Sequence, residues 1–245
     1  MQRPSAIGRF SIACITLPAL LAGCATAPEG DDAPAANKTV ADTSVANEAA
    51  PQAAPAAGKT AHAGIELCPM QISNPPPTDK SGKAIGGPIV SIKSVPLLLM
   101  PATNACLSSG YGPRSGRLHR GVDYHTRTSG DVLAAGDGVI VEAVTRADFG
   151  NMIVIDHGSG VYTRYAHLAS FAKGAAKGAK VRRGGALGPI GASGATSVKH
   201  LHFEILSGTY ATGAGSFGLS AHNPFDLPPA KSDVAALVGR EPPDA

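Results

Sequence analysis

The sequence predicts a mainly β protein in which an antiparallel sheet folds into a sandwich or a barrel-like arrangement. From residue 95 onward, short runs rich in β-branched and aromatic residues recur, separated by turn sequences such as TSGD, AGDG and GSG. Glycine (30 residues) and proline (20) are abundant, which disfavours a long helical bundle. Many short strands at regular spacing are typical of antiparallel sandwiches and barrels.

The first element expected along the chain is a signal peptide over residues 1–23. Arg3 and Arg9 precede the segment FSIACITLPALLAGC, whose apolar stretch is too short to span a bilayer as a stable helix. The sequence LAGC at residues 21–24 resembles a bacterial lipobox, which implies cleavage before Cys24 and a lipid anchor on that cysteine. A plain secretion signal cleaved near residues 25–27 is the alternative.

Residues 24–64 are expected to form a disordered tether. They are nearly all Ala, Pro, Thr, Asn, Asp and Glu, and they cannot bury enough apolar surface to offset the entropy of ordering. A tether of about 40 residues has an r.m.s. reach of roughly 35 Å. With a lipid on Cys24, the folded part would work at a distance from a membrane.

Residues 65–94 are predicted to form a Pro-rich arm with one strand near residues 88–92. Of the four cysteines, Cys14 leaves with the signal and Cys24 would be lipidated, so Cys68 and Cys106 remain as a pair. In an oxidising compartment a disulfide would join them, staple the arm to the next domain and contribute about 3–4 kcal/mol in the chain-entropy model. Two buried free thiols are the alternative.

The β domain is expected over residues 95–227. Its strands are predicted at GVDYH, VLAAG, GVIVEAV, NMIVIDHG, VYTRYAHL, KVRRGGALGPIG and KHLHFEIL. The segment FAKGAAKGAK is too rich in glycine for a helix. Residues 228–245 are expected to be a loose tail, with one or two helical turns at most.

The strand KHLHFEIL places unusual side chains together. Side chains alternate along a strand, so His200, His202 and Glu204 share one face while the apolar residues share the other. The apolar face is typical of a core strand. The polar face brings two imidazoles close together, which is a pattern that needs a chemical explanation.

Two further motifs supply that explanation. His119 and Asp123 lie in HRGVD, and His167 lies in YAHL. Neutral imidazoles and a carboxylate are zinc ligands. A zinc hydrolase needs three protein ligands, a proton acceptor and a group that stabilises the oxyanion. These three residues and the two histidines of KHLHFEIL match that requirement in number.

In this combination and order, HRGVD, YAHL and HLHFE resemble the M23 zinc metallopeptidases, the lysostaphin-type or LytM-like peptidoglycan endopeptidases. The resemblance covers roughly residues 95–227. It implies that Zn²⁺ is bound by His119, Asp123 and His202, and that His167 and His200 act in catalysis beside the scissile carbonyl. Which of the last two histidines is the general base stays open.

Other polar residues of this domain have weaker assignments. Glu204 could orient one histidine by a hydrogen bond, or face solvent at the end of its strand. His125 is expected at the edge of the cleft, and His157 and His222 are expected to be structural. Three more residues are candidates to line the cleft: Tyr111, Arg164 and Tyr165.

The predicted function is a zinc-dependent endopeptidase that hydrolyses peptide cross-links of bacterial peptidoglycan. The expected location is the outer membrane, facing the periplasm, since the lipobox implies a bacterium and Ala25 is not the aspartate that often signals inner-membrane retention. A net charge of +3 without a basic run gives no reason to expect a nucleic-acid partner. The arm, at residues 69–77, is a candidate cover for the cleft.

Two other functions remain as alternatives. Some LytM-like domains are catalytically inactive regulators that activate cell-wall amidases, but those lack zinc ligands, whereas all five groups are present here. A zinc-storing lipoprotein would need the ligands but would not explain His167 and His200.

Overall fold

The computed structural model describes residues 64–212 and 216–231. All of them belong to one compact unit, Asn47–Ala245. The expected signal peptide, the lipidated Cys24, the tether up to residue 63 and most of the tail lie outside the described residues, so their assignments stay predictions. Within the described part, no helix is long and apolar enough to cross a membrane.

The described residues form fourteen strands and one short 3₁₀ helix. In chain order these elements are β1 Ile89–Ile92, β2 Val95–Leu98, β3 Cys106–Ser109, β4 Gly112–Arg114, β5 Arg117–His119, β6 Val122–His125, β7 Asp131–Leu133, β8 Gly138–Arg146, β9 Gly150–Asp156, β10 Val161–Leu168, β11 Lys180–Val181, β12 Ala186–Pro189, β13 His200–Ser207, β14 Ser220–His222 and η1 Pro224–Asp226. The predicted mainly β fold is confirmed.

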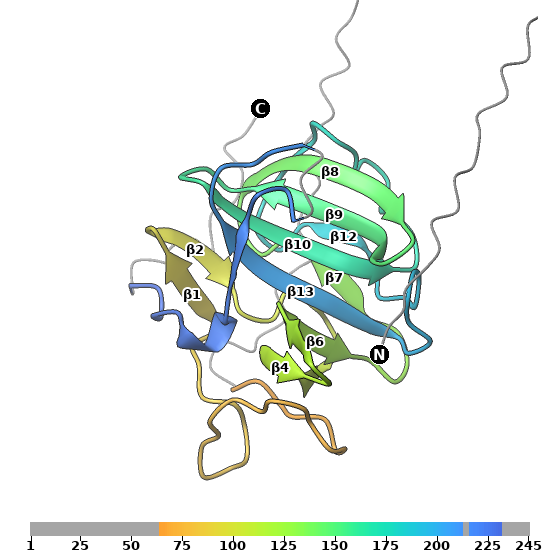
Figure 1. The fold of residues 1–245 in the computed structure, drawn as a ribbon. Helices are drawn as coiled ribbons and strands as arrows, with labels where there is room; N and C mark the ends of the chain where they lie inside the picture. Colours follow the sequence, from red (N-terminus) through yellow and green to blue (C-terminus); the bar gives the residue numbers. More distant parts are fainter. Residues whose placement is uncertain (1–63, 213–215, 232–245) are drawn as a thin grey trace, which may run out of the picture. The chain divides into compact units, whose positions relative to one another are not determined.

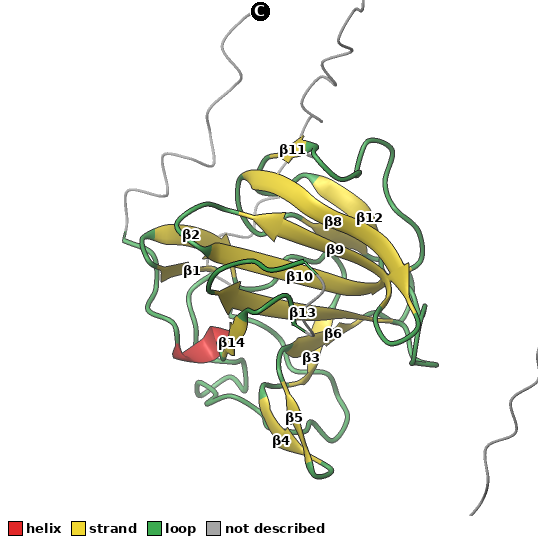
Figure 2. Cartoon of the chain, turned by 45° about the horizontal axis from the view of Figure 1, so that its top comes forward, coloured by secondary structure: helices red, strands yellow, loops and turns green. Residues whose placement is uncertain are grey.

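The largest sheet has the strand order β11-β8-β9-β10-β13-β6-β3, and β14 also pairs with β13 (Figure 1). The pairings between its strands are antiparallel, as expected. The long strands β8, β9, β10 and β13 lie side by side in its centre (Figure 2). Three smaller pairs, β1–β2, β4–β5 and β7–β12, stand outside this sheet.

One face of the large sheet packs on the main hydrophobic core. The alternate residues Leu201, Phe203 and Ile205 of β13 point into it, together with Leu97 of β2 and Val132 of β7. The core therefore lies between the large sheet and the small pairs β1–β2 and β7–β12. The intervening polar side chains of β13 project from the opposite face.

The opposite face of the sheet has a smaller apolar cluster. It is built by residues of β9, β10 and β13 and by the segment before β14: Met152, Val154, Tyr162, Ala166, Leu206, Phe217 and Leu219. Burial of apolar surface on both sides explains why the whole of β10 is buried. The histidines of β10 and β13 lie on this second face.

The arm runs along the edge of the large sheet. A disulfide joins Cys68 and Cys106, as the cysteine count predicts. Parallel bridges link Leu67 to Leu107 and Ser73 to Ser109, so the arm adds itself to β3. Ile65 and Ala84 also pack into the main core.

Two local differences from the sequence predictions concern loops and strand lengths. The strand expected at VLAAG ends at Leu133, and residues 112–119 form an unpredicted hairpin, β4–β5. That hairpin has a run of exposed residues from Pro113 to Leu118 and contains Pro113 and Gly116, so it has no alternating pattern from which a strand could be recognised. Residues 171–179 contain turns and no helix, and the expectation of no helix in this segment is met.

Candidate metal centre

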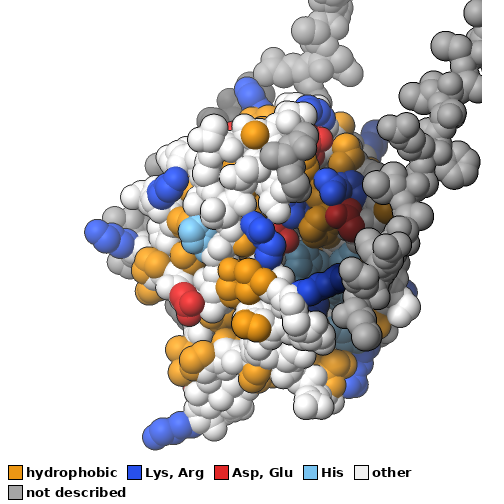
Figure 3. All heavy atoms as spheres, viewed as in Figure 1, with side chains coloured by type: hydrophobic (Ala, Val, Ile, Leu, Met, Phe, Trp, Pro, Cys, Tyr) orange, Lys and Arg blue, Asp and Glu red, His pale blue; other side chains and the backbone are white. Residues whose placement is uncertain are grey.

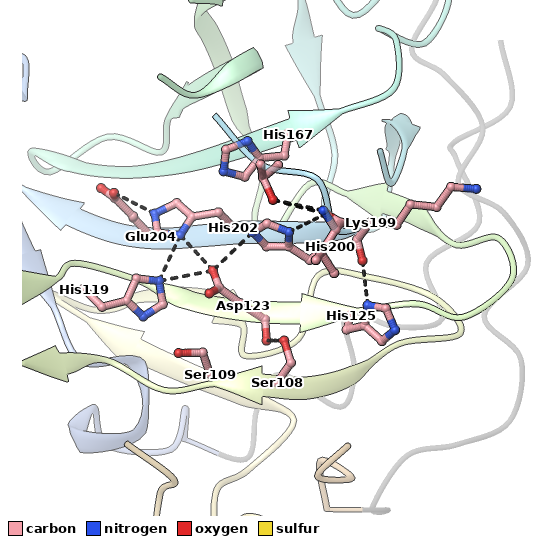
Figure 4. A network of polar contacts seen from close by, with 12 residues as sticks. Ser108, Ser109, His119, Asp123, His125, His167, Lys199, His200, His202 and Glu204 are labelled. Carbon is pink, nitrogen blue, oxygen red and sulfur yellow. Dashed lines mark hydrogen bonds and ion pairs between the residues drawn. The ribbon is translucent and has the colours of Figure 1, made fainter. Parts of the chain in front are cut away.

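Three polar side chains from three strands meet at one point (Figure 4). His119 ends β5, Asp123 lies on β6 and His202 lies on β13. The register of β6 and β13 places Asp123 directly opposite His202. Between β5 and β6, Gly121 lets the chain pass over β13, because a Cβ atom there would lie 2.3 Å from the carbonyl oxygen of Phe203.

The three inner atoms form a compact triangle. His119 Nε2 lies 3.1 Å from Asp123 Oδ1 and 3.1 Å from His202 Nδ1, and His202 Nδ1 lies 2.9 Å from Asp123 Oδ1. All three residues are buried. Tetrahedral zinc with bonds of about 2.0–2.1 Å separates its ligand atoms by roughly 3.3–3.4 Å. The triangle is therefore close to the size that a zinc ion requires.

The ring nitrogens that point away from the triangle, His119 Nδ1 and His202 Nε2, show where the ring protons lie. His119 Nδ1 lies 2.7 Å from the carbonyl oxygen of Gly110, and His202 Nε2 lies 3.0 Å from Glu204 Oε1. Both partners only accept, so both outer nitrogens donate their proton. In the neutral rings, lone pairs on the inner nitrogens then face the carboxylate of Asp123. Three lone-pair atoms this close repel one another unless a metal ion or a proton supplies positive charge between them.

The pKa shifts reflect the same requirement. Burial lowers the pKa of His202, but the hydrogen bonds and charges of Asp123 and Glu204 outweigh burial and raise it to about 9. Burial raises the pKa of Asp123, whereas its hydrogen bonds to His119 and His202 hold it well below its usual range. Without a metal ion, a proton on His202 supplies the positive charge, so metal binding must release that proton.

An arginine side chain binds the other carboxylate oxygen of Asp123, Oδ2. Arg114 Nη1 lies 3.1 Å from Asp123 Oδ2 and 2.9 Å from Ser109 Oγ. Asp123 Oδ1 is thereby left for the metal. Arg114 comes from the unpredicted β4–β5 hairpin, and no signal in the sequence marks it as a partner of Asp123.

A buried ion pair stands behind His202. Glu204 and Arg164 are each 1% exposed, and Arg164 Nη1 lies 3.2 Å from Glu204 Oε2. The guanidinium carbon of Arg164 also lies 4.7 Å from the centre of the Phe149 ring. Glu204 therefore orients His202, and the solvent-facing alternative for Glu204 is wrong. The expectation that Arg164 lines the cleft is also wrong, because the pairing holds it inside the protein.

His167 and His200 lie beside the three inner atoms (Figure 4). Their ring centres are 4.8 Å apart, and His200 Nε2 lies 3.7 Å from Asp123 Oδ1. His167 Nδ1 donates to the carbonyl oxygen of Ser193 at 2.7 Å, and His200 Nδ1 donates to that of Val198 at 2.8 Å. In the neutral rings each Nε2 thus carries a lone pair. Burial lowers the pKa of both histidines, which keeps them neutral near pH 7.

A β-bulge turns His167 toward the site. The pairing of β10 with β9 shifts register between Tyr165 and Leu168, and His167 has φ 64°. Strict alternation would place His167 in the main core with Tyr165. The bulge instead sends Leu168 into that core and leaves His167 on the face of His202. A positive φ at a residue other than glycine is strained and is found often at functional sites.

The five residues lie in a cleft of about 620 Å³. Arg114 and Arg117 of the β4–β5 hairpin line one part of it, Phe149 another, and Met70 comes from the arm. Figure 3 shows histidine side chains beside Lys or Arg side chains on the drawn face. His125 also lines the cleft, as expected, and its Nδ1 donates to the carbonyl oxygen of Lys199 at 2.7 Å.

Two tyrosines that were expected in the cleft lie elsewhere. Tyr165 is fully buried in the main core, where its hydroxyl accepts from the backbone N–H of Ala135 at 2.7 Å. Alternation along β10 puts it on the core face. Tyr111 lines a separate small pocket next to Pro75, Pro76 and Pro77. Both expectations are therefore wrong.

The two histidines expected to be structural lie away from the cleft. His157 Nδ1 donates to the carbonyl oxygen of Asp137 at 2.7 Å, and its Nε2 lies 2.7 Å from Thr163 Oγ1. His222 Nε2 lies 2.7 Å from Ser207 Oγ, next to the pairing of β13 and β14. Neither lines the cleft that holds the five site residues.

The fold and the site define a class: an antiparallel β-sheet domain with a candidate mononuclear metal centre and two neighbouring neutral histidines. Within that class, residues 117–213 match the model of Peptidase family M23, and the chain contains a domain of this family.

Several known proteins are similar to this region. The DD-carboxypeptidase/endopeptidase Mpg of Neisseria meningitidis serogroup B is 37% identical over 110 residues, which cover 42% of this chain and 25% of Mpg. The peptidoglycan DD-endopeptidase ShyA of Vibrio cholerae is 31% identical over 143 residues, 55% of this chain and 31% of ShyA. The chain thus spans about a quarter to a third of the length of these relatives.

A solved structure with a similar chain is the antimicrobial peptidase lysostaphin from Staphylococcus simulans. It is 29% identical and has a TM-score of 0.42, with 49% of this chain and 48% of lysostaphin covered.

Proposed function

We propose that this chain is a zinc-dependent endopeptidase that hydrolyses peptide cross-links of bacterial peptidoglycan. One observation carries the proposal: His167 and His200, each with a lone pair on Nε2, stand beside a triangle of three metal-binding atoms. The M23 domain and the endopeptidase names of its relatives support it.

The donor set fits zinc. Two imidazole nitrogens and one carboxylate oxygen, from His119, His202 and Asp123, are typical of a catalytic zinc site that keeps a fourth position open. A zinc ion held there would act as a Lewis acid and lower the pKa of water in the cleft.

The neighbouring histidines would move the protons of the hydrolysis. Water adds to the carbonyl carbon of the peptide bond, and a neutral imidazole, His167 or His200, accepts the proton that the water loses. When the C–N bond breaks, the same proton passes to the departing amine. Until then, the imidazolium can donate its Nε2–H to the oxygen on which negative charge develops. The second histidine stays neutral and can accept a hydrogen bond from the water through its Nε2 lone pair.

The names of the relatives support this substrate. ShyA is named a peptidoglycan DD-endopeptidase, and we extend that activity to this chain. In a Gram-negative wall the corresponding bond is the cross-link between D-alanine and diaminopimelate. An open cleft of about 620 Å³ is large enough to receive a peptide segment on its surface.

The test is an assay on purified cell-wall sacculi. The purified chain is incubated with sacculi, and the released muropeptides are separated by mass. We expect cross-linked dimers to disappear with a matching gain of monomers, a zinc chelator to stop the reaction and added zinc to restore it. Intact dimers, with zinc demonstrably bound, would contradict the proposal. Faster digestion by a cell-wall amidase in the same sample would instead support the regulatory alternative.

We also propose that the chain is an outer-membrane lipoprotein that faces the periplasm. The support is the sequence LAGC ending at Cys24 and the long polar tether that follows. Mass measurement of the mature protein should find a lipidated N-terminal Cys24. The variant Cys24→Ala should leave the membrane fraction, and an unchanged distribution of the variant would refute the anchor.

A further inference from the structure

The arm residues 66–74 are fixed at one end to β3 and at the other end to the segment that leads into the β4–β5 hairpin. At the first end, the disulfide joins Cys68 to Cys106. There the backbone N–H of Cys68 donates to the carbonyl oxygen of Leu107 at 2.9 Å, and that of Leu107 donates to Glu66 at 2.9 Å. The first end is therefore held both covalently and by strand-like hydrogen bonds to β3.

The second end holds the segment between β3 and the β4–β5 hairpin. The backbone N–H of Gly110 donates to the carbonyl oxygen of Ser73 at 2.8 Å. Asn74 Nδ2 donates to the carbonyl oxygen of Pro113 at 3.1 Å. The approach is so close that a Cβ atom on Gly110 would lie 1.9 Å from the carbonyl oxygen of Asn74. Only glycine allows this contact.

The same segment supports two of the metal-binding residues. The carbonyl oxygen of Gly110 accepts from His119 Nδ1 at 2.7 Å, while the N–H of the same residue is held by Ser73. Pro113 is followed by Arg114, whose guanidinium binds Asp123 Oδ2. The arm thus contacts Gly110, which holds His119. It also contacts Pro113 of the hairpin, and the next residue, Arg114, holds Asp123.

The hairpin needs such support. Its strands β4 and β5 have three residues each and pair only with each other. A two-stranded hairpin of this length is marginal by itself in water. His202, by contrast, stands in the middle of the large sheet.

We propose that residues 66–74 are a positioning segment of the metal centre, and that the Cys68–Cys106 disulfide makes zinc retention depend on the redox state of the protein. The inference rests on the proposed zinc site. It replaces the idea that the arm covers the cleft: the arm contributes Met70 to the lining, whereas its hydrogen bonds run to the segment that orients the ligands.

The first experiment tests the contact at Gly110. In Gly110→Ala the added methyl group must push Asn74 away, and zinc affinity, measured by competition with a chromophoric chelator, should fall about 10- to 100-fold, as for other groups that orient metal ligands. Gly87→Ala is the matched control. It lies in the same arm region, its added Cβ would meet no atom closer than 3.4 Å, and its affinity should stay parental.

The second experiment removes the Cys68–Cys106 disulfide and leaves Gly110 unchanged. Alanine at both Cys68 and Cys106 avoids free thiols that would bind zinc themselves. We expect weaker zinc binding and, in the zinc-free protein, faster amide hydrogen exchange over residues 110–119 than in the parent chain. The exchange measurement does not depend on activity or on metal.

The outcomes separate this inference from the proposed function. If the parent chain binds zinc and the double cysteine variant binds it equally well with parental exchange, the positioning role is refuted and the enzyme proposal stands. If the parent chain binds no zinc, the proposed function fails first. Should Gly110→Ala fail to fold by circular dichroism, the double cysteine variant decides alone.

Discussion

The cleft has two halves that hold their histidines in different ways. In the metal half, both nitrogens of His119 and of His202 are engaged, the outer ones by an acceptor and the inner ones by Asp123. In the other half, His167 and His200 are each anchored through Nδ1 to a backbone carbonyl. The proposed ligands are thus held through both ring nitrogens, whereas the two rings proposed to transfer protons keep one nitrogen available.

The strand β13 supplies one histidine to each half, so the difference comes from the neighbours. His202 lies opposite Asp123 and is followed by Glu204 on the same face. His200 begins the strand and lies opposite His125, which offers it no carboxylate. Two imidazoles two residues apart on one strand thereby have different neighbours on the adjacent strand, in keeping with the different roles proposed for them.

The largest expected effect is that of removing a ligand from the metal half. In His202→Ala the triangle loses one of its three atoms, and Asp123 loses its partner on β13. Bound zinc should fall below stoichiometric amounts by metal analysis, and muropeptide release should fall to background. Stoichiometric zinc in the variant would show that the metal half is wrongly assigned.

A substitution in the other half of the cleft should lower the hydrolysis rate without lowering the zinc content. His167→Ala removes a proton acceptor and no ligand, so zinc content should stay parental while the rate of cross-link hydrolysis falls by about 10²- to 10⁴-fold. His125→Ala is the control, because His125 lines the same cleft and its ring hydrogen bonds to the carbonyl oxygen of Lys199, not to any of the five site residues among the part of the chain that the structure describes. A parental rate in His167→Ala would remove His167 from the mechanism.

A third prediction concerns the ion pair behind His202. Glu204→Gln keeps the shape but removes the charge that His202 Nε2–H faces, so zinc affinity should fall by about 10- to 100-fold. The same change should lower the pKa of His202 in the zinc-free protein from about 9, because the lost carboxylate stabilises the imidazolium. NMR titration measures this shift. An unchanged pKa would mean that Glu204 acts only through packing.

Much of the site could be predicted because it follows from local alternation. The shared face of His200, His202 and Glu204 needs only the period of a strand, and the structure has it. His167 could not be oriented in this way, since a bulge in β10 reverses its side. The same alternation puts Tyr165 on the core face of β10, which is why it does not line the cleft.

The supports of the ligands were less predictable, because they depend on contacts between distant parts of the chain. Arg114 reaches Asp123 only after the β4–β5 hairpin has formed, and that hairpin has no alternating pattern. Gly110 donates its backbone N–H to Ser73 of the arm, which lies 37 positions earlier in the chain, and no local sequence signal predicts this pairing. The pair Cys68 and Cys106 was the exception, because cysteine chemistry leaves few partners.

The prediction with the smallest expected effect concerns His157. It tests whether a pKa lowered by burial is enough to identify a catalytic histidine. Burial lowers the pKa of His157, as it lowers those of His167 and His200, yet His157 lies outside the cleft. Because the folded pKa of His157 lies below the ordinary histidine value of about 6.5, the ring is mostly neutral in both states above that pH. As the pH falls through about 6.5, the unfolded chain binds the proton first, so stability declines until the folded pKa is reached.

His157→Gln should therefore flatten the acid side of the stability profile and leave zinc content and hydrolysis at neutral pH unchanged. Melting temperatures of both zinc-free proteins between about pH 8 and about pH 5 measure the difference, in which the titrations shared by the two proteins cancel. Parallel profiles would show that the Asp137 and Thr163 contacts of His157 hold no pH-dependent energy. A flattened profile with intact activity would show that burial lowers the pKa of a histidine outside the cleft as well. Only the free Nε2 beside the metal-binding atoms would then set His167 and His200 apart.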